Sequence, residues 1–186
     1  EDWYLELFFH TYFERNASTL VYKVDGLIVS MLHMIPFLFK DSNLCEKKVL
    51  YFYALATLPE HRGLGIMEQL MKRAKEYALV NEFSLEFLIP AEEQLFEYYK
   101  NREFTKFTSK TTLSVTQKVS QLQLKRYEIN EIELSDCKEV FEKIYQYQQK
   151  EEFKGILLSE RDFVFFTKTL FHEGGGIFMV YEKNET

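Results

Sequence analysis

The sequence contains few cysteines. Cys45 and Cys137 are the two cysteines in 186 residues. They are too few and too far apart to form a disulfide framework or a metal cluster, which fits a reducing compartment. We expect both to be small hydrophobic residues of the core, and we expect a cytoplasmic protein without a metal.

An excess of cationic residues and a long apolar run are also missing. The formal net charge is −6, whereas a nucleic-acid binder needs a basic face to contact phosphates. The longest apolar stretch, residues 27–39, includes Ser30, His33 and Pro36 and falls short of the roughly 18 residues that a membrane span needs. We therefore expect no nucleic acid and no membrane among the partners.

Two common nucleotide-binding patterns are absent. Neither Lys-Ser nor Lys-Thr follows the glycines at 63 and 65, as a phosphate-binding P-loop requires. No Gly-x-Gly-x-x-Gly run of a dinucleotide-binding fold occurs either.

The first two thirds of the chain predict alternating helices and strands. Apolar residues make up 46% of the sequence, enough for a packed core. We expect a helix over 2–14, two strands joined at Asp25-Gly26, a strand over 47–57, a helix from Ile66, a strand over 84–90, a helix over 91–101 and a strand or hairpin over 105–117. This order predicts an α/β (α+β) fold with a mixed, mostly antiparallel central sheet and helices on both faces.

The character of the chain changes after residue 117. A strand is expected over 124–129, followed by a helix with Ser135 as its N-cap. A second helix is expected from Ser159, whose spacing to Asp162 matches a capping box. Its predicted apolar stripe consists of Phe163, Phe166 and Leu170, before the three glycines that end it.

The end of the chain resembles its beginning. Residues 2–26 and 161–185 both contain an aromatic helix, a loop and a Val-Tyr strand, either by chance or because a second copy begins. The second interpretation divides the chain into a domain over 1–116 and an incomplete, similar domain over 117–186. It treats the sequence as an excerpt, with a last strand that has no partner.

The stretch HRGLGI, residues 61–66, has the composition of an anion-binding turn. Gly63 and Gly65 remove side chains where the backbone turns, so that successive N–H groups can face one concavity. The helix that follows adds free N–H groups and the positive end of its dipole. A pyrophosphate would fit there, although a tight connection alone would also explain the two glycines.

The surrounding residues resemble the acetyl-CoA-binding motif of the GCN5-related N-acetyltransferase (GNAT) family. Arg62 and Gly65 match its fixed positions, and Pro59 stands where the family often has proline. Met67 replaces the usual Gly or Ala. Further along, Tyr99 and Phe104 match a later family element.

Glu103 replaces the Gly that is usual between those two positions. The resemblance covers about residues 1–115, and LIPAEEQLFEYY is also similar to tandem acetyltransferases of the enhanced-intracellular-survival type. It implies a GNAT-like acyl-CoA N-acyltransferase fold, followed here by a partial second copy.

The resemblance also implies site residues. The positions matched to acetyl-CoA binding are Ala56, Thr57, Leu58, Arg62, Gly63, Leu64, Gly65, Ile66 and Met67. Backbone N–H groups of residues 56–58 would stabilise the oxyanion of a tetrahedral intermediate. Tyr99 would act as the general acid for the CoA thiolate, unless its ring simply packs on a helix face, as we expect of Tyr98.

Two assignments remain open from the sequence. Arg62 contacts phosphate, or it pairs with Glu60 or faces solvent. His33, His61 and Glu86 lie on or near the relevant strands, and none stands out as the base.

The resulting hypothesis is an enzyme that transfers an acetyl group from acetyl-CoA to a primary amine, either a small molecule or a peptide. The acidic charge balance is compatible with a cationic amine. The alternative is a degenerate, non-catalytic fold that binds CoA or a protein partner, which Met67 and Glu103 would favour. An aromatic cluster near the ends also leaves a homo-oligomer open.

Overall fold

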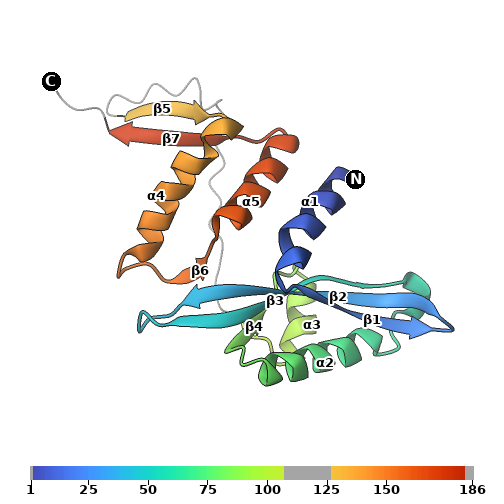
Figure 1. The fold of residues 1–186 in the computed structure, drawn as a ribbon. Helices are drawn as coiled ribbons and strands as arrows, with labels where there is room; N and C mark the ends of the chain where they lie inside the picture. Colours follow the sequence, from blue (N-terminus) through green and yellow to red (C-terminus); the bar gives the residue numbers. More distant parts are fainter. Residues whose placement is uncertain (1, 107–126, 183–186) are drawn as a thin grey trace.

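The computed structural model describes residues 2–106 and 127–182, arranged around a central sheet (Figure 1). The elements of the first part are α1 (Asp2–Tyr12), β1 (Ser18–Val24), β2 (Leu27–Lys40), β3 (Glu46–Thr57), α2 (Ile66–Val80), β4 (Leu85–Phe87) and α3 (Leu95–Lys100). Those of the second part are β5 (Tyr127–Ile132), α4 (Cys137–Gln149), β6 (Gly155–Leu157), α5 (Glu160–His172) and β7 (Ile177–Glu182). The boundary expected at 116/117 and most of the strand or hairpin expected over 105–117 lie outside the described residues.

The central sheet is mixed, as the sequence predicted. Strands β1, β2 and β3 are antiparallel neighbours, β4 runs parallel to β3, and β6 pairs with the end of β2. Asp25 and Gly26 join β1 to β2 with φ angles of 49° and 84°, the positive values that a two-residue hairpin of the primed type requires. The predicted hairpin is confirmed.

The two faces of the sheet carry different cores. Because side chains alternate along a strand, β2 sends Leu32 and Met34 to one face and His33 and Ile35 to the other. On the first face, α2 and α3 cover the sheet (Figure 1). On the second face, α1 and α5 build an aromatic core around Phe8, Tyr12, Ile35 and Phe165.

Strand β3 has two irregularities close to the glycine turn. Its pairing with β4 covers Val49–Tyr51 only, so the remainder of β3 has an open edge on that side. Its register with β2 shifts where Ala54 and Leu55 lie opposite the single residue Leu32, and Ala54 has a φ of 49°. Such a bulge bends the strand and redirects its backbone groups.

The second part of the chain joins the aromatic face. Phe165 of α5 packs against Phe8 and Tyr12, and Arg161 donates to the Glu14 carboxylate at 2.9 Å. The last strand does have a partner, because β7 pairs antiparallel with β5; the expectation of an unpaired strand was wrong. Both α1–β1 and α5–β7 are a helix followed by a strand, but the described residues do not show a second copy of the first domain.

Helix α5 buries a different stripe from the one predicted. Phe163, Phe165 and Thr167 are buried, whereas Phe166 and Leu170 are 47% and 39% exposed. The reason is that α5 lies between two cores: Phe163 contacts α4, and Phe165 contacts α1. A single amphipathic stripe does not describe a helix that packs on two sides.

Of the two predicted N-caps, one is present. Ser159 accepts a hydrogen bond from the N–H of Asp162, and the Asp162 carboxylate accepts one from the N–H of Ser159, which confirms the capping box. Ser135 does not cap α4, because a 3₁₀ turn over Leu134–Asp136 precedes that helix. Its hydroxyl contacts the Asp136 carboxylate instead.

We expect Ser159→Ala to lower the free energy of unfolding by about 1 kcal/mol, because it removes the hydroxyl that accepts from the N–H of Asp162 and donates to the Asp162 carboxylate. Ser135→Ala is the matched control and should change it by less than about 0.5 kcal/mol. Urea unfolding of the two variants measures both values. Equal effects would contradict the assigned caps.

Candidate functional site

A cavity of about 410 Å³ lies at the glycine turn. Its lining residues come from the end of β3, the turn, the first turn of α2 and the segment at α3: Thr57, His61, Arg62, Gly63, Gly65, Ile66, Met67, Glu68, Tyr98 and Arg102. Six of the residues that the sequence assigned to acetyl-CoA are in this set. Ala56, Leu58 and Leu64 are not.

The turn presents a row of free backbone donors to this cavity. Gly63 and Gly65 have φ angles of 76° and 72°, and Gly65 is the N-cap of α2 without a capping side chain. Within the described chain, the N–H groups of residues 63–68 have no backbone or side-chain acceptor, and the first bond of the helix runs from Gln69 to Gly65. A Cβ at either glycine would meet nothing within 4 Å. The turn therefore fits an anion such as pyrophosphate.

Arg62 adds a guanidinium group at the entrance of the turn. Its Nε donates to the Thr57 carbonyl at 3.0 Å, and within the described residues no carboxylate, including that of Glu60, lies within ion-pair distance of it. Its terminal nitrogens are therefore free to bind an anion. Of the alternatives left by the sequence, pairing with Glu60 is not observed, and contact with phosphate or with solvent stays open.

The backbone of β3 offers one outward donor next to the turn. The N–H of Leu58 donates to the Val29 carbonyl at 2.9 Å and is used within the sheet. Because N–H groups alternate along an antiparallel ladder, that of Ala56 also faces β2, and that of Thr57 faces the open edge of β3. Buried Ser30 fixes this segment, since its hydroxyl bonds the Ala56 carbonyl and the Thr57 hydroxyl at 2.9 and 2.8 Å.

The two neighbouring tyrosines of α3 have different surroundings. Tyr99 packs against the core beneath the sheet, with its ring centre 6.0 Å from that of Phe104, and burial raises the pKa of its phenol. Its hydroxyl is therefore protonated at neutral pH, as a general acid must be. Tyr98, which we expected only to pack on the helix, lines the cavity.

The two departures from the family pattern are both accommodated. Glu103 has a φ of 70°, the left-handed conformation that glycine adopts most easily, so this turn keeps the same backbone with a different residue. Lys75 of α2 donates to the Glu103 carboxylate at 3.0 Å and to the Arg102 carbonyl at 3.0 Å, which ties the turn to the helix. The side chain of Met67 divides its contacts between the core and the cavity.

Sequence reasoning missed Glu68, Tyr98 and Arg102. The Arg102 guanidinium carbon lies 3.7 Å from the centre of the Tyr98 ring, and its Nη2 donates to the Glu68 carboxylate at 3.1 Å. The four-residue spacing of Tyr98 and Arg102 could have indicated their contact, because such residues are neighbours on a helix. Glu68 is 34 residues away from Arg102, and no local pattern connects them.

The three candidate bases do not meet at one point. His61 lines the cavity, Glu86 lies in β4 and is half-buried, and His33 is buried on the aromatic face beside Phe8 and Phe13. The imidazole Nδ1 of His33 bonds the Thr19 hydroxyl at 2.7 Å. The structure singles out none of them as the base.

The buried His33 predicts a pH effect on stability. Burial lowers the pKa of its imidazole in the folded state, so the unfolded state binds a proton first as the pH falls. The free energy of unfolding should therefore decrease as the pH drops below about 6.5, and this decrease should be smaller in His33→Gln. His61→Gln is the control that should keep the wild-type slope. Equal slopes in His33→Gln and wild type, from urea unfolding between pH 7.5 and 5, would contradict the prediction.

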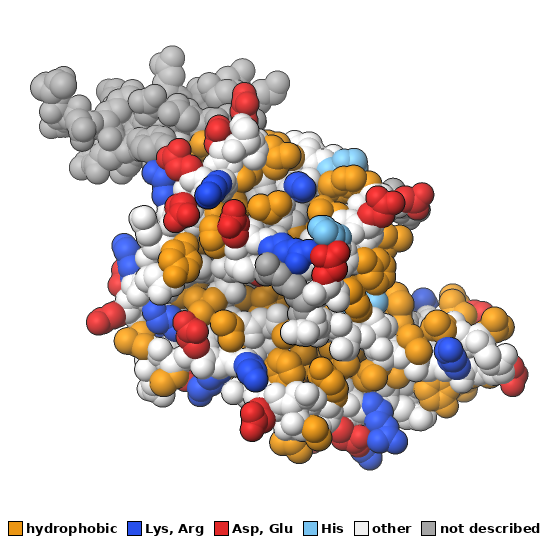
Figure 2. Space-filling model, viewed as in Figure 1, with side chains coloured by type: hydrophobic (Ala, Val, Ile, Leu, Met, Phe, Trp, Pro, Cys, Tyr) orange, Lys and Arg blue, Asp and Glu red, His pale blue; other side chains and the backbone are white. Residues whose placement is uncertain are grey.

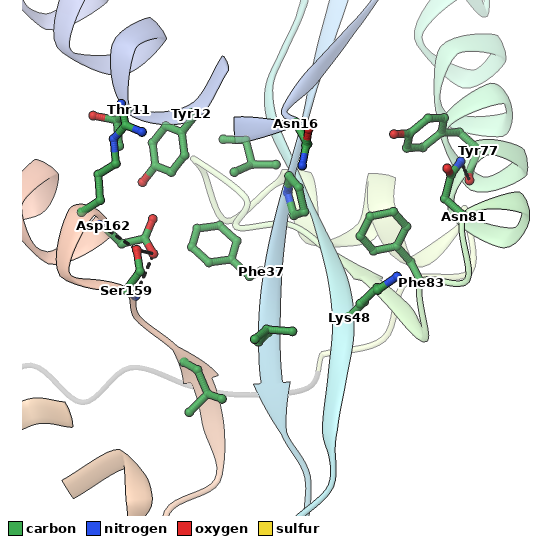
Figure 3. A pocket seen from close by; sticks show the side chains of 15 residues that line it. Thr11, Tyr12, Asn16, Phe37, Lys48, Tyr77, Asn81, Phe83, Ser159 and Asp162 are labelled. Atoms are coloured by element: carbon green, nitrogen blue, oxygen red, sulfur yellow. Dashed lines mark hydrogen bonds between the residues drawn. The ribbon is translucent and has the colours of Figure 1, made fainter. Parts of the chain in front are cut away.

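A larger cavity, of about 590 Å³, shares no lining residue with the one at the turn. It follows the edge of β2 between β1 and β6. Tyr12, Phe37, Ser159 and Asp162 lie on one side of the strand, and Lys48, Tyr77, Asn81 and Phe83 lie on the other (Figure 3). Side chains separated by a strand do not converge on one reacting atom, so we assign the functional site to the glycine turn.

Two further features of the described chain concern partners. No helix in it is long and apolar enough to cross a membrane, and it contains no group of three His, Cys, Asp or Glu residues placed to hold a metal ion. On the face drawn in Figure 2, acidic, basic and apolar side chains are interspersed.

Three solved structures are similar to this chain, two of them with a TM-score of 0.50. Glucosamine-6-phosphate N-acetyltransferase from Arabidopsis thaliana is 9% identical with a TM-score of 0.50, and the match covers 61% of this chain and 78% of that one. A transcriptional regulator from Bacillus halodurans is 19% identical with a TM-score of 0.50, covering 62% and 77%. An aminoglycoside acetyltransferase from an uncultured soil metagenomic sample is 20% identical with a TM-score of 0.43, covering 53% and 65%.

These identities show a common fold and nothing more specific. Among curated proteins, none matches the sequence. The family described as "Acetyltransferase (GNAT) domain" matches residues 4–106, more than half of the chain, including the whole glycine turn. With its mixed sheet, bulged β3 and glycine turn, the chain belongs to the GNAT acetyltransferase family.

Proposed function

We propose that this chain transfers an acetyl group from acetyl-CoA to a primary amine by direct attack. The observation that carries the proposal is the cavity at the glycine turn, whose lining combines the two glycines and the first turn of α2 with the Arg62 side chain. Family membership supports acetyl-CoA as the donor substrate. The turn and the first turn of α2 would hold its pyrophosphate.

The remaining steps follow from the position of this turn at the end of β3. The outward N–H of Thr57 would donate to the thioester carbonyl as it becomes an oxyanion, a contribution of about 10²–10³ in rate for one such donor. Tyr99 would donate its proton to the departing thiolate. Leu55, on the bulge, packs against the same core as Tyr99, which supports a thiol position between β3 and α3.

The second part of the chain would help to form the binding site of the acceptor amine. Helix α5 packs with α1 on the face of the sheet opposite α2, whereas the glycine turn belongs to the α2 side. We assign the amine to the face that α1 and α5 cover, so that it approaches the open edge of β3 from the side opposite the cofactor helix. A tandem arrangement, with residues 117–186 as the start of a second copy, remains part of this proposal.

The test is the release of CoA thiol from acetyl-CoA in the presence of a mixture of amines, including an aminoglycoside, a polyamine and a lysine peptide. Thiol release that depends on an amine supports the proposal. CoA binding without release by any amine would instead support the non-catalytic alternative. Absence of CoA binding would reject the enzyme and the CoA-binding form of the alternative, and would leave a fold that binds a protein partner.

A further inference from the structure

A second arginine, Arg102, lines the same cavity as Arg62. It follows the end of α3, and its side chain is only 24% exposed. Its plane lies on the Tyr98 ring at 3.7 Å, and Nη1 donates to the Tyr98 carbonyl at 2.9 Å. These contacts hold the group in one orientation, since a stacked and hydrogen-bonded arginine has little rotational freedom left.

The hydrogen bonds of Arg102 are incomplete. Its Nε is fully buried and has no partner within the described residues. Its Nη2 is satisfied only by the carboxylate of Glu68, a side chain that is 65% exposed. An ion pair with so exposed a partner is weak and exchanges easily.

Glu68 lies in the first turn of α2, the position where the free N–H groups attract an anion. Glu68 thus belongs to the same helix turn whose N–H groups a phosphate would use, and Glu68 and Arg102 line one cavity. A phosphate carries more charge than a carboxylate and matches the fork of a guanidinium group in two parallel bonds.

We propose that Arg102 is a phosphate-binding residue of the CoA site, and that Glu68 competes with the cofactor for it. This inference rests on the proposed function. In the free protein, Glu68 holds Arg102 in place. When CoA binds, Arg102 transfers its hydrogen bond from Glu68 to a phosphate oxygen, and the Glu68 side chain turns to solvent. The affinity for CoA then depends on how much more strongly Arg102 binds the phosphate than it binds the Glu68 carboxylate.

The proposal predicts that substitutions at the two members of this ion pair change the affinity for CoA in opposite directions. Arg102→Gln should weaken CoA binding by about tenfold or more, the loss expected for a hydrogen bond to a charged group. Glu68→Gln should tighten CoA binding severalfold, because it removes the competing anion and its repulsion. A purely structural ion pair predicts the reverse for Glu68, since breaking it would disorder Arg102 and weaken binding.

Calorimetric titration with CoA at two salt concentrations tests this on the wild-type protein, Arg102→Gln and Glu68→Gln. Lys100→Gln and Glu97→Gln are the matched controls, because they alter an exposed ion pair of α3 that does not line the cavity, and their Kd should stay within about twofold of wild type. The salt dependence of Kd should decrease in Arg102→Gln and persist in the controls.

Each outcome decides a separate point. If the wild type binds no CoA, the proposed function fails together with this inference. If the wild type binds and Arg102→Gln binds equally well, or Glu68→Gln binds more weakly, only this inference fails. If Arg102→Gln does not fold, as judged by circular dichroism, the sign of the Glu68→Gln effect alone decides.

Discussion

Tyr99→Phe is expected to reduce kcat by about 10²–10⁴-fold while the Kd for CoA stays within about twofold of wild type. The substitution removes one hydroxyl group and keeps the ring that packs against Phe104. In the described chain that hydroxyl has no hydrogen-bond partner, so the fold loses little without it. Steady-state kinetics with an amine found in the thiol-release screen give kcat, and calorimetry gives Kd.

Tyr77→Phe is the matched control for this prediction. Neither of these tyrosines lines the cavity at the glycine turn, and Tyr77 packs against the same core as Tyr99 but is on α2 rather than α3. It should leave kcat unchanged. A Tyr99→Phe variant with wild-type kcat would remove Tyr99 from the mechanism and leave it the packing role that its burial also allows.

Gly65→Glu is expected to weaken CoA binding by roughly 100-fold or more. The φ of 72° at this position costs a residue with a side chain about 1–2 kcal/mol. The added carboxylate would also extend into the open space before the turn, where it would repel a phosphate at a cost of several kcal/mol. Calorimetric titration with acetyl-CoA measures the loss.

Gly174→Glu separates the two causes. Gly174 has a similar φ of 79°, also with nothing within 4 Å of an added Cβ, but it lies after α5 and outside the cavity. It should lose a similar free energy of unfolding and keep the wild-type Kd. If both glycine variants lost CoA binding equally, reduced stability rather than the site would explain the result.

Local chemistry made much of this fold predictable. The Asp25-Gly26 hairpin, the Ser159–Asp162 capping box and the glycine turn each depend on residues within a few positions of one another, and the structure contains all three.

Long-range packing was not predictable in the same way. The helix of residues 160–172 buries Phe165 rather than Phe166 because α1 and α4 approach it from different sides, which its own periodicity cannot show. The strand of residues 177–182 pairs with β5, and the helices α4 and α5 lie between these two strands in the sequence. The Arg102–Glu68 pair likewise requires the end of α3 to meet the start of α2.

Glu103 shows how a mismatch to a family pattern can mislead. Replacement of a usual glycine favoured a degenerate fold, yet the residue adopts the left-handed φ of 70° and is tied to Lys75. This turn requires a left-handed backbone conformation. Glu103 adopts that conformation with more local strain than a glycine would have.

A crystal structure of the chain with CoA tests the central claim most directly. The account predicts a pyrophosphate within hydrogen-bond distance of backbone N–H groups of residues 63–68, with the Arg62 guanidinium beside it. The account would be contradicted if the pyrophosphate bound elsewhere. It would also be contradicted if the N–H groups of this turn contacted no ligand in the crystal of the CoA complex.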